Sequence, residues 1–119
     1  MPLVRIEILK GRSPEYKKCL LDCVHEGLAE AFGTEEWDRF QRVAEYDRED
    51  FETAPDKTDD FVIIELTIFP GRSAERKRAA IEGITSLLGE RLSIKPSDIF
   101  IIMHEPPLEN WGLGGHQKG

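Results

Sequence analysis

Hydrophobic and polar residues alternate near the start of the chain, where Val4, Ile6 and Ile8 are separated by Arg5 and Glu7. A period of two is typical of a strand with one buried face. Apolar residues then recur at helical spacing, namely Leu20, Leu21, Val24, Leu28 and Phe32. A second apolar segment at residues 40–46 follows. The pattern therefore predicts a strand, a helix and a strand in succession.

Residues with strong local preferences support these boundaries. Ser13 is a good helix N-cap, and Pro14 suits the first helical position because its missing N–H has no partner there. Gly33 follows the last apolar position and is expected to end the helix.

The order of elements occurs twice, because residues of the first unit recur 60 positions later. The shared residues include Gly11-Arg12-Ser13 and Gly71-Arg72-Ser73, together with Ile8 and Ile68, Leu28 and Leu88, Asp38 and Asp98, and Phe40 and Phe100. The second unit predicts a strand at 61–69, a helix capped by Ser73 and a strand at 99–103. We expect one domain over residues 1–119, with pseudo-repeats at about 2–46 and 61–104.

Two βαβ units with right-handed crossovers predict an α+β fold, a two-layer α/β sandwich with a four-stranded sheet and both helices on one face. Ile63, Leu66 and Ile102 cannot all face the helices. The uncovered face therefore needs another cover, and we expect an oligomer. The acidic segment 47–60 is the expected mobile link, and the tail 106–119, with its four glycines, is expected to be irregular or a short hairpin.

Composition excludes several classes of function. The chain has 119 residues and a net charge of −7, which argues against nucleic-acid binding through clustered basic residues. The apolar stretches at 61–64 and 99–103 are far shorter than the roughly 20 residues of a membrane-spanning helix. The first residues do not resemble a secretory leader, so we expect a cytoplasmic protein. Cys19 and Cys23 read as reduced thiols, and with His25 they do not converge on a metal, so no metal site is expected.

Pro2 is the most suggestive residue for chemistry, because removal of Met1 would leave a secondary amine at the chain end. An α-amino group titrates near ~7.7–8.0, and burial or nearby arginines would lower that pKa. A neutral amine at neutral pH is a good general base. The alternative is an ordinary second residue that precedes a strand.

Four other side chains have both a functional and a structural interpretation. Arg12 and Arg72 lie at equivalent strand-to-helix corners, where a guanidinium can bind a carboxylate or pair with a nearby acid. Asp38 is placed to orient a water or an amine, or to cap a turn. Trp111 lies in a glycine-rich segment and is suited to form the wall of a pocket. A phosphate-binding loop or a nucleophile elbow is not evident.

Taken together, these residues resemble the tautomerase superfamily, with its MIF-like fold. The chain begins Met-Pro, turns through Gly11-Arg12-Ser13 and ends in Asn110-Trp111-Gly112-Leu113-Gly114-Gly115. That order is similar to oxalocrotonate tautomerase, a single βαβ unit. The fused length, the stretch Trp37-Asp38-Arg39-Phe40-Gln41 and the corner Pro70-Gly71-Arg72-Ser73 are similar to the malonate semialdehyde decarboxylase branch and its tautomerase-like relatives.

The resemblance implies a cofactor-independent enzyme, usually a homotrimer, that acts on a small carboxylate substrate. It assigns the base to Pro2, the acid to Asp38 and a carboxylate ligand to Arg72, with Trp111 as a wall and Arg12 as a further substrate-binding residue. Pro70 stands where the decarboxylase has the first arginine of its Arg-Pro-Arg corner. We expect keto–enol isomerisation of a 2-oxo acid; the alternatives are decarboxylation or hydration of a small 3-oxo or unsaturated acid, and a non-catalytic ligand-binding module.

Overall fold

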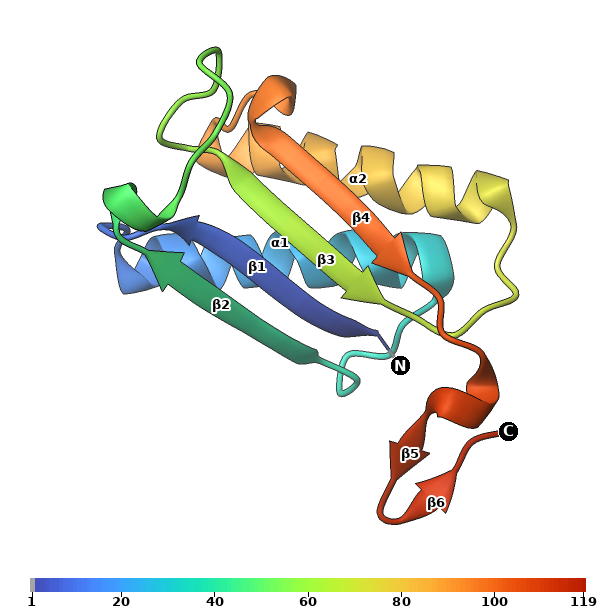
Figure 1. Cartoon of the computed structure of the whole chain (residues 1–119). Coiled ribbons are helices and arrows are strands. Elements are labelled where there is room, and N and C mark those ends of the chain that lie inside the picture. Colours follow the sequence, from blue (N-terminus) through green and yellow to red (C-terminus); the bar gives the residue numbers. More distant parts are fainter. Residues whose placement is uncertain (1) are drawn as a thin grey trace.

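The computed structural model describes residues 2–119 and shows two layers, a four-stranded sheet and two helices on one of its faces (Figure 1). The main elements are β1 (Leu3–Leu9), α1 (Pro14–Phe32), β2 (Phe40–Tyr46), β3 (Val62–Thr67), α2 (Ala74–Leu92) and β4 (Ile99–His104). The predicted fold class is therefore confirmed. Strand β3 is shorter at both ends than the predicted segment 61–69, since the ladder with β1 and β4 ends at Thr67.

The strand order β2-β1-β3-β4 determines which residues meet. Each βαβ unit contributes a parallel pair, and β1 and β3 join the two units antiparallel, with Leu3 opposite Thr67. As a result, β1 and β2 begin at the end of the sheet where β3 and β4 finish. We call this the Pro2 end, and the opposite end, where β1 and β2 finish, the Arg12 end.

Equivalent residues cap the two helices. The Ser13 hydroxyl accepts a hydrogen bond from Tyr16 N at 3.0 Å, and the Ser73 hydroxyl accepts one from Arg76 N at 3.2 Å. Gly11 and Gly71 both have φ of 113°, a conformation that is strained for other residues. This positive φ explains why a glycine stands at the corner in both units. Gly33 ends α1 with φ of 72°, as predicted.

The core lies between the sheet and the helices and is made of aliphatic side chains. It comprises Val4, Ile6, Ile8, Ile64 and Leu66 from the central strands, Ile68 directly after β3, and Leu20, Val24, Leu28, Ala80, Ile84 and Leu88 from the helices. The helices pack closely at Gly27, where an added Cβ would lie 2.5 Å from Ile84 Cγ1. Among residues 2–119, no helix is long and apolar enough to span a membrane.

Within residues 2–119, the other face of the sheet carries no helix. Phe100 and Ile102 of β4 are 61% and 44% exposed on it, whereas Leu66 faces the helices. Toward the other edge of the sheet, on β1 and β2, lies a polar group in which Arg5 donates to the Tyr46 hydroxyl, which in turn donates to Glu7. The prediction that the apolar strand residues divide between the two faces is confirmed.

The link 47–60, expected to be mobile, is instead fastened to the body. Thr58 donates from its backbone nitrogen to Asp98 Oδ1 at 2.9 Å and from its hydroxyl to the other carboxylate oxygen. Phe51 packs on Phe61, with ring centres 6.1 Å apart. The sequence missed these contacts because they join residues far apart in the chain.

The tail folds into the short hairpin that the sequence allowed. Strands β5 (Gly112–Leu113) and β6 (His116–Gln117) pair antiparallel around Gly114 and Gly115. Both glycines have positive φ, 62° and 83°, which a two-residue hairpin turn of this type requires. Figure 1 shows the hairpin extending away from the sheet beyond the ends of β3 and β4.

Candidate functional site at the Pro2 end of the sheet

Pro2 is buried at the end of the sheet and directly precedes Leu3. Leu3 pairs with Phe40 on one side and with Thr67 on the other. Pro2 therefore lies between the segment that leads into β2 and the segment that leaves β3. The first of these segments carries Asp38 and the second leads to Arg72, so strand register brings three of the predicted residues to the same end (Figure 1).

Arg72 lies at the corner between β3 and α2, and its guanidinium is held against apolar groups. Its Nη1 donates to the Phe69 carbonyl oxygen at 3.2 Å, and its guanidinium carbon lies 4.3 Å from the centre of the Phe32 ring. Burial lowers the pKa of Arg72, as does the nearby Arg76, while Glu105 opposes this. Within residues 2–119, no carboxylate forms an ion pair with Arg72, and Glu105 pairs with Lys77 at 2.9 Å.

Asp38 lies at the end of the turn before β2. The residue is only 9% exposed, and its backbone nitrogen donates to the Glu35 carbonyl oxygen at 3.0 Å. The equivalent Asp98 is fully buried and accepts both hydrogen bonds from Thr58. The turn interpretation thus applies to Asp98, whereas Asp38 lies at the end of the sheet that holds Pro2.

Trp111 lines an apolar cavity of about 150 Å³ at the Pro2 end, together with Leu3, Phe40, Gly112, Leu113 and Lys118. Its indole packs edge-on against Phe69 with ring centres 4.7 Å apart, and its Nε1 donates to the Pro106 carbonyl oxygen at 3.1 Å. The indole is thereby fixed as a wall. Pro2, Asp38 and Arg72 do not line the cavity, but each lies close in sequence to a residue that lines it or packs on its wall.

Sequence reasoning missed two side chains of this cavity. Phe40 is 46% exposed at the start of β2, although it belongs to an apolar strand pattern. Lys118 comes from the tail, where its ammonium lies 5.8 Å from the centre of the Phe69 ring and its backbone nitrogen donates to the Trp111 carbonyl oxygen. Only the hairpin could have indicated Lys118, since the chain must turn back at Gly114 and Gly115 for it to return to Trp111.

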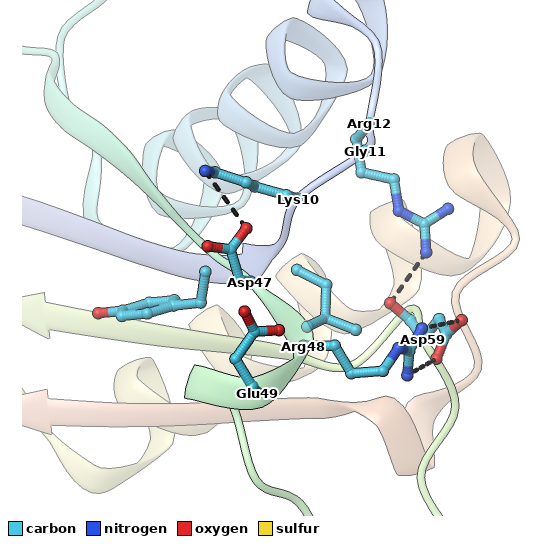
Figure 2. Close-up of a pocket in the computed structure, with 9 residues that line it drawn as sticks. Lys10, Gly11, Arg12, Asp47, Arg48, Glu49 and Asp59 are labelled. Carbon is cyan, nitrogen blue, oxygen red and sulfur yellow. Dashed lines mark hydrogen bonds and ion pairs between the residues drawn. The ribbon is translucent and has the colours of Figure 1, made fainter.

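Arg12 follows the end of β1 and so lies at the other end of the sheet, apart from the four residues above. Figure 2 shows Arg12 pointing toward Asp59 at this end. Its Nη2 donates to the Asp60 carboxylate at 2.8 Å and to the Asp59 carbonyl oxygen at 2.9 Å. The surrounding cavity, of about 300 Å³, also contains ion pairs of Lys10 with Asp47 and of Arg48 with Asp59. Within one chain, Arg12 therefore does not share a site with Pro2.

The Pro2 end combines a buried proline near the start of the chain, a cation that is not neutralised by a carboxylate within residues 2–119, and an apolar wall. A partly buried cation beside an apolar wall can bind a small carboxylate, because the electrostatic attraction is stronger there than in water. Within the same residues, no group of three or more His, Cys, Asp or Glu side chains could hold a metal ion.

Family models match both parts of the chain. Two models, each described as "Tautomerase enzyme", match residues 38–114 and residues 2–57. The probable tautomerase YusQ of Bacillus subtilis (strain 168) is 29% identical in an alignment of 119 positions. The alignment covers 96% of this chain and 94% of the relative.

Solved structures agree with this over nearly the full length. The FG41 malonate semialdehyde decarboxylase inhibited by 3-bromopropiolate is 29% identical with a TM-score of 0.85, covering 94% of this chain and 88% of the other. A fused 4-OT described as an asymmetric trimer has a TM-score of 0.88 at 19% identity, covering 98% and 95% of the two chains. The second likeness establishes the fold alone.

Proposed function

Since the chain belongs to the tautomerase family, we propose that it is a cofactor-independent tautomerase in which the amino group of Pro2 is the general base. The proposed substrate is a small 2-oxo acid whose keto and enol forms interconvert. The observation that carries the proposal is the position of Arg72, a partly buried cation without an ion-pair partner in residues 2–119, at the same end of the sheet as Pro2.

The base requires that Met1 be removed, because a proline nitrogen in a peptide bond has no basicity. The small side chain of Pro2 suits removal of the initiator methionine. Pro2 is also buried, and it directly precedes the apolar Leu3. Burial disfavours the charged form of an amine, so the freed nitrogen would be neutral in a larger fraction of molecules than an exposed terminus. Arg72 acts in the same direction because a nearby positive charge opposes protonation of the amine.

The proposed reaction transfers protons only. The Pro2 nitrogen takes a proton from the carbon next to the substrate carbonyl, and the electron pair left behind forms the enolate. Arg72 binds the carboxylate or the developing enolate oxygen, where two N–H groups of one guanidinium can donate together. The protonated amine then returns its proton to the enolate oxygen or to another carbon. Atoms and charge balance, and the amine is regenerated.

Asp38 and Trp111 have supporting roles in this proposal. Asp38 orients a water or hydrogen-bonds to the polar end of the substrate, for which its nearly buried position before β2 is suited. Trp111 and Leu113 exclude water from one side, and this strengthens the contact between the substrate and Arg72.

Decarboxylation or hydration of a 3-oxo or unsaturated acid is a second candidate. It is favoured by the 29% identity to the malonate semialdehyde decarboxylase over most of the chain. Asp38 and Pro2 would then share activation of water or polarisation of the carbonyl. Pro70 leaves one cation fewer at the corner before Arg72, and this favours isomerisation over decarboxylation.

The proposal includes assembly into a homotrimer through the uncovered sheet face. Phe100 and Ile102 are exposed there in the single chain, and burial of such side chains against another copy would stabilise the assembly. The trimeric fused 4-OT supports this arrangement for the fold. A role for Arg12 in binding substrate at a Pro2 site would require such a neighbouring subunit, since the two residues lie at opposite ends of one sheet.

The function is tested by turnover of small enols, followed by ultraviolet absorbance, with protein whose intact mass shows loss of Met1. We expect ketonisation of a phenylenolpyruvate-type enol, and a decrease of about 10²-fold or more for Pro2→Ala with unchanged thermal unfolding. Release of carbon dioxide from malonate semialdehyde without enol turnover would support the decarboxylase instead. Ligand binding without any turnover, indifferent to Pro2→Ala, would support a non-catalytic module.

A further inference from the structure

The turn that carries Asp38 is tied to helix α1 by charged side chains on both sides of that aspartate. We define the Asp38 loop as residues 33–39, which connect α1 to β2. The ends of this loop are held by the helix and the strand that it connects. Its middle stays in place only if further contacts hold it. Two contacts provide such fixation.

The first contact is made by Arg39, directly after Asp38. Its Nη2 donates to Asp22 Oδ1 at 2.8 Å, and its Nη1 donates to Glu36 Oε1 at 3.3 Å. The hydrogen bond to Asp22 raises the pKa of Arg39 above its ordinary value. The Arg39 guanidinium thus connects the middle of α1 to Glu36, which precedes Asp38, while Arg39 itself follows Asp38. The same contacts direct Arg39 toward α1, where it is engaged by two carboxylates.

The second contact is made by His25 of α1. The imidazole is nearly buried, with 6% of its side chain exposed, and its Nε2 lies 3.0 Å from Glu36 Oε2. The Glu36 carboxylate therefore contacts His25 through one oxygen and Arg39 through the other. Glu36 is largely exposed, but His25 and Arg39 both contact its carboxylate. These contacts form a network, which restrains a side chain more than an isolated surface ion pair does.

The second half of the chain provides an internal comparison. Sixty positions after Asp22, His25, Glu36 and Arg39 stand Glu82, Thr85, Pro96 and Ile99. None of the last three can form the equivalent ion pairs. In that half, Asp98 is fixed by Thr58 of the link instead. The tie to the helix is therefore present only in the half whose aspartate lies at the Pro2 end.

We propose that Asp22, His25, Glu36 and Arg39 form a clamp that positions Asp38 for the reaction at the Pro2 end. This inference rests on the proposed function. The four side chains are positioning residues: they hold the backbone on either side of Asp38, so that its carboxylate stays in one place relative to Pro2. Displacement of an acting group by about 1 Å can reduce the rate by roughly 10²-fold, so loss of the clamp lowers kcat more than it raises KM.

A fluorescence measurement tests the clamp without any assay of activity. Trp37 is adjacent to Asp38 and 74% exposed, and Trp111 is the other tryptophan of the chain, so Trp111→Phe leaves Trp37 as the single reporter. We expect the combined Asp22→Asn and Glu36→Gln variant to show faster nanosecond depolarisation of Trp37. The matched control is Glu26→Gln, since Glu26 lies one turn after Asp22 but pairs with Arg91 of α2 at 2.7 Å. Equal depolarisation in the clamp variant, the control and the parent would overturn the clamp.

A kinetic cycle tests whether the clamp acts through Asp38. In the chain with both tryptophans, we expect the clamp variant to lower kcat about tenfold with little change in KM, and Glu26→Gln to leave both unchanged. In an Asp38→Asn background the clamp variant should cost nothing further. Arg39→Lys should retain more of kcat than Arg39→Met. An equal loss in both backgrounds would refute positioning through Asp38. If the parent chain turns over no enol, the proposed function fails, and the depolarisation of Trp37 alone then decides whether the clamp holds the loop.

Discussion

Arg72 and Arg12 lie at equivalent corners of the two halves of the chain, but only Arg12 forms an ion pair with a carboxylate within residues 2–119. Arg12 contacts Asp60 at 2.8 Å, whereas Arg72 rests on the Phe32 ring with its charge available. The link 47–60 supplies Asp60, whereas Glu105, which directly follows β4, attracts Arg72 only at longer range and is paired with Lys77 at 2.9 Å. The two halves thus share a fold but differ in whether the arginine at the corner is paired with a carboxylate.

Replacement of Arg72 should impair catalysis more than folding. We expect Arg72→Met to lower kcat/KM by about 10²–10³-fold, because a donor to the developing oxyanion is lost. Arg72→Lys should recover only part of this, since lysine lacks the paired N–H groups. The control is Arg48→Met, which removes an exposed arginine paired with Asp59. Equal kinetics for Arg72→Met and the parent would contradict the role of Arg72.

The cavity wall should control access of water. We expect Leu113→Ser to raise KM and lower kcat/KM about tenfold, because the site becomes wetter and the attraction to Arg72 weaker. Leu108→Ser is the matched control, because Leu108 is also exposed in the tail but does not line the cavity. If both variants behave alike in steady-state assays with the same enol, the tail hairpin has no part in the site.

The contact between the helices predicts opposite effects for two glycines. Gly27→Ala should lower the free energy of unfolding by about 1–3 kcal/mol, because the new Cβ would meet Ile84 at 2.5 Å. Gly83→Ala should be neutral or stabilising by up to about 1 kcal/mol, since its nearest atom would be 4.0 Å away and alanine favours a helix. Urea unfolding measures both. A stabilising Gly27→Ala would show that the helices are not in this close contact.

Acid should weaken the attachment of the link to the body. Burial acts to raise the pKa of Asp98, but the hydrogen bonds from Thr58, together with the charges of Lys95 and Lys57, outweigh it, and the pKa lies below the ordinary value. A folded-state pKa that is depressed adds stability above the unfolded value of about 3.9, and this stability is lost as pH falls through the folded value. We expect Thr58→Val to cost about 1 kcal/mol of unfolding free energy at pH 7 and progressively less below about pH 4. If the cost of Thr58→Val does not change with pH, the hydrogen bonds from Thr58 do not set the pKa of Asp98.

Much of the fold could be predicted because its causes are local and repeated. Alternation near Val4, the Ser13 and Ser73 caps and the glycines at the corners each determine a short segment, and strand pairing then follows from two βαβ units. The register that places Pro2 and the segment leading to Arg72 at the same end of the sheet is consistent with that reasoning. The pairing of Arg12 with Asp60 was not predictable, since it joins residues 48 positions apart through the link.

The clamp around Asp38 was also beyond sequence reasoning. Asp22 and Glu26 lie on successive turns of one helix and look alike as surface acids, yet one contacts the Asp38 loop and the other contacts α2. Lys118 was missed for the same reason, because only the folded hairpin places it at the cavity. Periodicity identifies buried faces, whereas the partner of a charged side chain depends on the whole fold.

The central claim is that the nitrogen of Pro2, freed from Met1, is the base. The most direct measurement compares one protein prepared in two forms, with intact masses that differ by one methionine, on the same enol substrate. We predict turnover by the form that begins with Pro2, and loss of about 10²-fold or more in the form that retains Met1. Equal turnover by both forms would contradict the account, since an amide nitrogen cannot accept the proton.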